Sequence, residues 1–159
     1  MSWRAVDPRT SPRKVIGIDI DIRENNRKAI ESHPLSFKIK MIEGSTIDSD
    51  IVENVKSNIS SDDKVLVSLD SNHTEEHVYA ELDAYSDLVT VGSYCIVFDT
   101  IVEDLPIGSF PNRPWDVGNN PKIAAIKWLN KNPNFIVDRE IDNKLLVTVA
   151  PEGYLRRLA

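Results

Sequence analysis

Residues 64–74 read KVLVSLDSNHT, a short apolar run that ends in Asp70 and passes into a polar segment. Such a run is typical of a parallel strand that is buried on both faces. Open α/β sheets bind ligands at the edge formed by the carboxyl ends of their parallel strands. Asp70 is therefore the first candidate for a functional residue.

Two other apolar segments also end in acids. Residues 14–20 (KVIGIDI) predict a first strand that delivers Asp19, and residues 93–98 predict a later strand followed by Asp99. The carboxyl ends of parallel strands lie at one edge of a sheet, so we expect Asp19, Asp70 and Asp99 to converge. The alternative is ordinary strand-end capping and turn formation, which aspartate favours.

Helical patterns alternate with the strands and predict an α/β fold. We expect further strands at residues 37–42, 135–137 and 145–149, and helices at about residues 23–32, 48–59, 74–85 and 120–131. This order predicts a mostly parallel sheet that ends in a C-terminal antiparallel hairpin, formed by the last two strands around a turn at residues 141–144. Residues 1–13 contain two prolines and no alternation, so we expect an N-terminal tail and one domain over residues 14–159.

Composition excludes several classes of protein. A net charge of -6 without a basic cluster argues against nucleic-acid binding. The single cysteine, Cys95, permits neither an intrachain disulfide nor a thiolate metal cage, which predicts a reducing, cytoplasmic location. No apolar run approaches the roughly 20 residues that a membrane span requires.

Two other site patterns occur near the predicted strand ends. HTEEH, at residues 73–77, matches the H-x-x-E-H pattern of a zinc-peptidase class, but His73 precedes the predicted helix and no third ligand is evident, so we expect His77 to be a surface histidine. A phosphoacceptor receiver domain would need a lysine at the end of the strand in residues 94–100, where there is none. The proline-rich loop at residues 105–121 contains Phe110 and Trp115 and predicts an active-site lid beside Asp99.

Several longer motifs occur in order along the chain. They are VIGIDIDIRENNRKAIESHP (15–34), IKMIEGSTID (39–48), VLVSLDSNHTEEHVYAEL (65–82), DLVTVGSYCIVFDT (87–100) and PEGYLRR (151–157). Together they resemble the cephalosporin hydroxylase and rhamnosyl O-methyltransferase family. The resemblance implies a Rossmann-like, class I methyltransferase sheet and an S-adenosylmethionine-dependent O-methyltransferase that acts on a small hydroxylated or glycosidic substrate.

The resemblance also implies a cofactor-binding set. Asp19 ends the strand whose acid binds the ribose hydroxyls of S-adenosylmethionine in such enzymes. Ser45 and Thr46 follow the next strand, at the turn that lies against the adenine, and Asp48 is nearby. Helix capping is the alternative role of Asp48.

By the same resemblance, Asp70, Asp99 and Thr100 correspond to ligands of Mg²⁺ in metal-dependent members. Only Asp99 supplies a carboxylate where related enzymes have two adjacent acids, or an acid and an amide. His73 stands where a related class has a catalytic lysine, so His73 and Asp70 are the expected catalytic residues. Histidine suits the removal of a hydroxyl proton before a direct attack on the sulfonium methyl group.

One expected element is missing from the pattern. The family's first strand and its glycine-rich turn have no counterpart, which predicts an N-terminally truncated sheet. The gap is closed by pairing of residues 15–19 with residues 65–70, by a strand from a partner chain or a second copy, or not at all. The alternative function is a catalytically inactive remnant that acts as a binding or assembly subunit.

Overall fold

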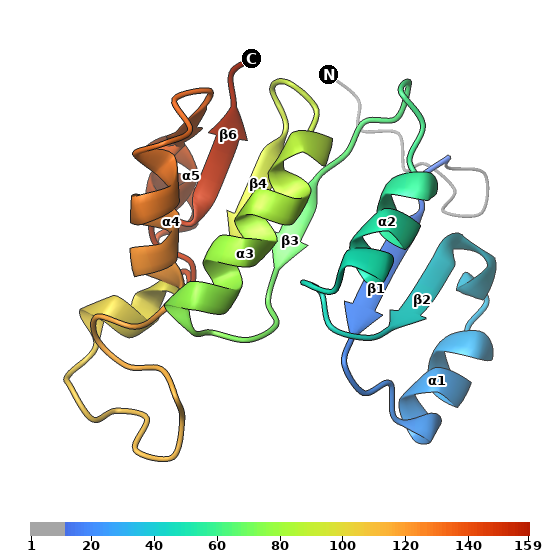
Figure 1. Ribbon diagram of the computed structural model, residues 1–159, viewed down its shortest axis with the longest axis horizontal. Helices are drawn as coiled ribbons and strands as arrows, with labels where there is room; N and C mark the ends of the chain where they lie inside the picture. The colour runs from blue at the N-terminus through green and yellow to red at the C-terminus, as the bar shows by residue number, and fades with distance from the viewer. Residues whose placement is uncertain (1–11) are drawn as a thin grey trace. The chain divides into compact units, whose positions relative to one another are not determined.

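The computed structural model describes residues 12–159 and divides into two compact units (Figure 1). The N-terminal unit extends to Val55, and the C-terminal unit is Lys56–Ala159. The tail expected at residues 1–13 lies outside the described residues, except for Pro12 and Arg13.

The N-terminal unit contains a two-stranded parallel sheet. Its elements are β1 (Val15–Asp19), α1 (Glu24–Glu31), β2 (Ile39–Glu43) and α2 (Ser49–Ser57), whose last residues pass the unit boundary. The strands pair in register from Val15 opposite Ile39 to Asp19 opposite Glu43, so both end at the same edge. This confirms the first two predicted strands, although a short 3₁₀ helix, Ser36–Lys38, precedes the second.

The C-terminal unit contains a mixed four-stranded sheet in the order β3-β4-β6-β5. Its elements are β3 (Val67–Leu69), α3 (Glu75–Tyr85), β4 (Tyr94–Val97), α4 (Pro121–Leu129), β5 (Phe135–Val137), α5 (Arg139–Leu145) and β6 (Tyr154–Arg157). β3 and β4 are parallel, whereas β6 is antiparallel to both β4 and β5. Helices α3 and α4 lie side by side against this sheet (Figure 1).

The predicted C-terminal hairpin is wrong in its second strand. β5 forms at its predicted residues, but its antiparallel neighbour is β6 rather than residues 145–149. The expected turn is instead α5, which begins where the Asp138 side chain accepts a hydrogen bond from the Glu140 amide. Leu146 and Val147 after α5 are 86% and 89% exposed, so the apolar pattern there is not matched by burial.

The described strands form two sheets. β1 pairs with β2 in one sheet, and β3 pairs with β4 in the other. The three ways of closing the sheet that the sequence leaves open stay predictions.

The core of the C-terminal unit lies between its sheet and helices α3 and α4. Its fully buried side chains include Leu82, Val97, Trp128 and Leu155. Gly153 is required where the chain enters β6, because a β carbon there would collide with the Val97 carbonyl oxygen. Among residues 12–159, no helix is long and apolar enough to cross a membrane.

Candidate active site

Asp70, His73 and Asp99 lie together beyond the carboxyl ends of the parallel strands β3 and β4. One potential ligand atom from each lies within 4.8 Å of the others. Asp70 directly follows β3, Asp99 comes shortly after β4, and His73 belongs to the turn that precedes α3. Asp70 and Asp99 therefore converge as the strand pattern predicts, whereas Asp19 belongs to the other unit.

The register of the two strands explains why these acids meet. Leu69 is opposite Val97, and the Phe98 amide donates to the Leu69 carbonyl at 3.0 Å. Both strands therefore end at the same level. Asp99 then adopts a left-handed conformation with φ 52°, which aspartate tolerates better than most residues, and the chain turns into the 3₁₀ helix Thr100–Asp104.

His73 is the most enclosed member of the cluster. Its Nε2 contacts Asp99 Oδ2 and lies 3.8 Å from Asp70 Oδ1, while Nδ1 lies 3.1 Å from the Ser71 carbonyl oxygen. The His73 side chain is 17% exposed, whereas that of Asp70 is 61% exposed. The cluster thus has an enclosed imidazole and a carboxylate that solvent and small molecules can reach.

The predicted loop covers this histidine. The rings of His73 and Trp115 are stacked, with centroids 4.8 Å apart and planes at 23°, and the Arg113 guanidinium lies 5.1 Å from the Trp115 ring centroid. The Asn119 side chain links the loop to the start of α3 by accepting a hydrogen bond from the Glu75 amide at 2.9 Å. The loop therefore contacts the candidate site, and its opening and closing as a lid stays a prediction.

A buried carboxylate that the sequence pattern did not single out lies behind the cluster. Glu81 is 1% exposed and accepts a hydrogen bond of 2.6 Å from the Ser71 hydroxyl, next to Asp70. The spacing of Val78 and Leu82 already places Glu81 on the buried side of α3. Glu81 also lies 3.6 Å from His77 Nε2.

The two histidines of HTEEH face different acids. His77 approaches Glu81, and the cluster described above contains His73 only. The histidine pair of the zinc-peptidase pattern is therefore not assembled. His77, expected at the surface, is half-buried, with its side chain 17% exposed.

Burial keeps the single cysteine, Cys95, out of chemistry that requires a thiolate. Burial, with a smaller contribution from the charge of Glu81, raises the pKa of Cys95 to about 12. Cys95 therefore remains a protonated thiol in the sheet, consistent with the exclusion of a thiolate metal cage.

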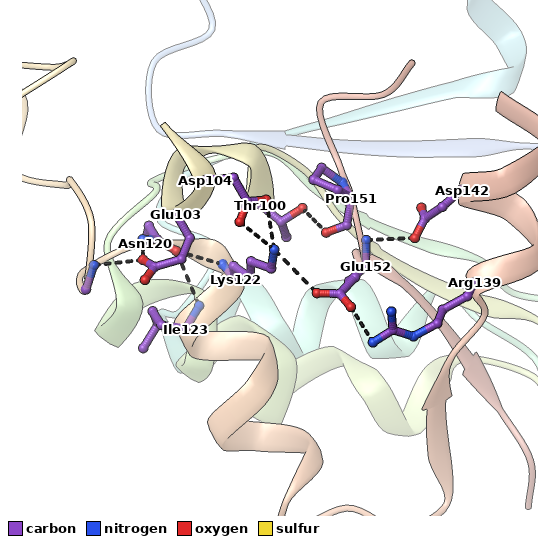
Figure 2. A network of polar contacts seen from close by, with 11 residues as sticks. Thr100, Glu103, Asp104, Asn120, Lys122, Ile123, Arg139, Asp142, Pro151 and Glu152 are labelled. Carbon is purple, nitrogen blue, oxygen red and sulfur yellow. Dashed lines mark hydrogen bonds and ion pairs between the residues drawn. The ribbon is translucent and has the colours of Figure 1, made fainter. Parts of the chain in front are cut away.

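Thr100 lies outside the cluster, in a polar network that anchors the segment after Asp99 (Figure 2). Its buried hydroxyl donates to the Pro151 carbonyl at 2.7 Å. Lys122 bridges Asp104 and Glu152 at 2.8 and 3.3 Å (Figure 2). Burial opposes the charge of Lys122, but the hydrogen bonds and charges of these two acids outweigh it and raise the lysine pKa.

The Glu103 carboxylate accepts hydrogen bonds within the same network. Its Oε2 accepts hydrogen bonds from Asn120 Nδ2 at 2.5 Å and from the Gly118 amide at 2.7 Å. Asn120 in turn caps α4 by accepting from the Lys122 and Ile123 amides, which confirms the predicted helix start. This network therefore fixes both ends of the loop that carries Trp115.

The predicted cofactor-binding residues follow the two strands of the N-terminal unit. Asp19 is exposed at the end of β1, and its carboxylate accepts a hydrogen bond of 3.0 Å from the Asp21 amide. Ser45 and Thr46 are half-buried in the turn after β2, while exposed Asp48 precedes α2. The structure thus brings all four to the carboxyl-end side of this sheet.

Gly44 shapes the turn between β2 and α2. It has φ 151°, and a β carbon would lie 2.6 Å from Ile51 Cδ1. Its amide donates to the Asp19 carbonyl at 2.9 Å, which ties the turn to the end of β1.

Comparison with known proteins identifies related sequences. The family model described as rhamnosyl O-methyltransferase/CmcI matches residues 4–158. Rhamnosyl O-methyltransferases of Mycobacterium tuberculosis and Mycobacterium bovis are 30% identical over 149 residues, which cover 92% of this chain and 56% of each relative. The chain thus spans about half the length of these curated relatives. No solved structure matches it.

Proposed function

Because the chain belongs to the rhamnosyl O-methyltransferase/CmcI family, we propose that it carries out S-adenosylmethionine-dependent O-methylation of a small hydroxylated or glycosidic substrate. The convergence of Asp70, His73 and Asp99 beyond two parallel strands carries this proposal. The name of the curated relatives makes a rhamnosyl hydroxyl the first substrate to test.

The N-terminal unit has groups that fit the cofactor. Asp19 presents an exposed carboxylate at a strand end, which suits a pair of ribose hydroxyls, and Glu43 opposite is already paired with Arg27 at 2.5 Å. Ser45 and Thr46, with Asp48 beyond them, would border the adenine. When bound, S-adenosylmethionine supplies a sulfonium methyl group that passes to the substrate oxygen while sulfur retains the electrons of the broken bond.

The C-terminal cluster has donors that fit a divalent cation. Asp70 and Asp99 would hold it, with Mg²⁺ as the ion that the family resemblance implies. Thr100, the other predicted ligand, would have to give up its hydrogen bond to Pro151. A bound cation lowers the pKa of a substrate hydroxyl.

The same cluster supplies the group that removes the hydroxyl proton. Two residues can accept it, His73 through Nε2 or Asp70 through its carboxylate. The substrate oxygen then attacks the methyl carbon directly, so no covalent enzyme intermediate is required. Trp115 covers His73 and limits the access of water from that side.

Calorimetry with S-adenosylmethionine, in the presence and absence of Mg²⁺, tests the cofactor proposal. We expect the intact chain to bind the cofactor and Asp19→Ala to lose about tenfold or more in affinity, because a charge-assisted hydrogen bond contributes about 1.5–3 kcal/mol. Asp21→Ala is the matched control, since it removes a neighbouring exposed carboxylate while keeping the amide that contacts Asp19.

The absence of heat at high micromolar cofactor would overturn the enzyme proposal in favour of an inactive binding or assembly subunit. Binding that is unchanged in Asp19→Ala would remove Asp19 from the cofactor site. Transfer of a labelled methyl group to a rhamnosyl glycoside tests the substrate.

We also propose that a second copy or a partner chain supplies a further strand. Within its own sheet, each of β1 and β3 is an edge strand. Unpaired strand edges promote association. Light scattering over a range of concentrations should therefore give a mass above that of one chain, whereas a folded, monodisperse monomer would contradict this.

A further inference from the structure

We infer that His73 is itself a metal ligand, and that the Asp70–His73–Asp99 cluster holds a divalent transition-metal ion such as Mn²⁺ or Co²⁺ in preference to Mg²⁺. The inference rests on the proposed function in one respect: both place the reaction at this cluster. It changes the role of His73 from proton acceptor to ligand.

The contacts of the imidazole ring carry the first step. Nδ1 lies 3.1 Å from the Ser71 carbonyl oxygen and Nε2 contacts Asp99 Oδ2. A carbonyl and an ionised carboxylate only accept hydrogen bonds. If Nδ1 carries the ring hydrogen and donates to Ser71, the Nε2 lone pair of the neutral ring faces the Asp99 carboxylate. A cation bound by both side chains would replace this direct contact and remove the repulsion.

The Ser71 contact is itself typical of a metal-bound histidine. Such residues almost always donate their second ring N–H to a carboxylate, a backbone carbonyl or water, which fixes the tautomer that leaves the other nitrogen free for the metal. The stack with Trp115 fixes the plane of the ring as well. The Nε2 atom is therefore held in place before any ion binds.

The types of donor atom decide the class of ion. Mg²⁺ takes oxygen ligands in nearly ideal octahedral geometry. Imidazole nitrogen suits transition metals, while carboxylates also suit Mn²⁺. One enclosed nitrogen and two carboxylates, with Asp70 open to solvent, form a mixed site that can complete its coordination with water or a substrate oxygen.

With His73 bound to the metal, Asp70 is the residue that accepts the proton of the substrate hydroxyl. A nitrogen bound to a metal has no lone pair with which to accept a proton, so His73 is excluded as the base while the ion is present. The Asp70 carboxylate has a second oxygen and is the most exposed member of the cluster.

Pulsed electron paramagnetic resonance of the full chain loaded with Mn²⁺, without cofactor, tests the inference. We expect nitrogen hyperfine coupling from one imidazole. His73→Gln should abolish the coupling and weaken Mn²⁺ binding by about tenfold or more, while weak Mg²⁺ binding changes little. The chain has three histidines, so His33→Gln and His77→Gln are complete controls and should keep the coupling.

A second variant guards against a folding defect. His73→Asp replaces nitrogen with oxygen, so it should retain Mn²⁺ binding without nitrogen coupling. Absence of Mn²⁺ binding by the intact chain, Mn²⁺ binding without nitrogen coupling, coupling that survives in folded His73→Gln, or Mg²⁺ binding as tight as Mn²⁺ binding would each overturn the inference.

The two proposals fail in different measurements. Methyl transfer without nitrogen coupling would overturn the assignment of His73 and leave the proposed function standing. Nitrogen coupling in a chain that gives no heat with S-adenosylmethionine would support the metal site and overturn the proposed function.

Discussion

Asp70→Asn should reduce methyl transfer by about 10²- to 10⁴-fold, the usual contribution of a group that handles a proton in the transition state. The substitution removes one negative charge from the cluster but keeps the size of the side chain. Because the Asp70 side chain is 61% exposed, we expect the fold to survive. The measurements are methyl transfer at saturating substrate, divalent-ion affinity and circular dichroism.

Asp62→Asn is the matched control for this prediction. Asp62 is an exposed acid in the turn before β3, so its substitution removes the same charge from the same unit outside the cluster. We expect its activity to remain within about twofold of the unmodified chain, as surface substitutions have small effects. If Asp70→Asn retains both its ion affinity and its activity, Asp70 does not belong to the site.

Trp128→Ala should lower the free energy of unfolding of the C-terminal unit by about 3–5 kcal/mol, the usual loss for a buried tryptophan. Trp128 is 1% exposed, donates from Nε1 to Asp83 Oδ1 at 2.8 Å and packs edge-to-face against Phe135, with ring centroids 5.2 Å apart. It therefore joins α4 to both α3 and β5. Urea unfolding monitored by circular dichroism measures the loss.

Two variants separate the contributions of Trp128. Asp83→Asn weakens the hydrogen bond and keeps the ring packing, so we expect a loss of about 1 kcal/mol. Trp115→Ala removes a half-buried tryptophan from the loop, with a smaller expected effect on unfolding than Trp128→Ala. Equal stability of Trp128→Ala and Trp115→Ala would contradict the central position assigned to Trp128.

Local sequence patterns correctly predicted the strands and helices that a few neighbouring residues specify. The apolar runs before Asp70 and Asp99 form β3 and β4, and Asn120 with Pro121 marks the start of α4. The apolar alternation of residues 145–149 was misleading, because a strand also needs a neighbour with which to pair. β6 pairs with β5 instead. Because β6 ends in Arg156 and Arg157, its sequence lacks the apolar pattern that predicts a strand.

The sequence by itself determined that Asp70 and Asp99 follow neighbouring parallel strands, since the apolar runs specify the strands and the parallel pairing aligns their ends. Only the tertiary structure decided what surrounds them. The orientation of His73 depends on Trp115 and Asp99, and the burial of Glu81 depends on packing beneath the Ser71 turn. These contacts join segments that are distant along the chain, so their geometry arises from packing rather than from local sequence pattern.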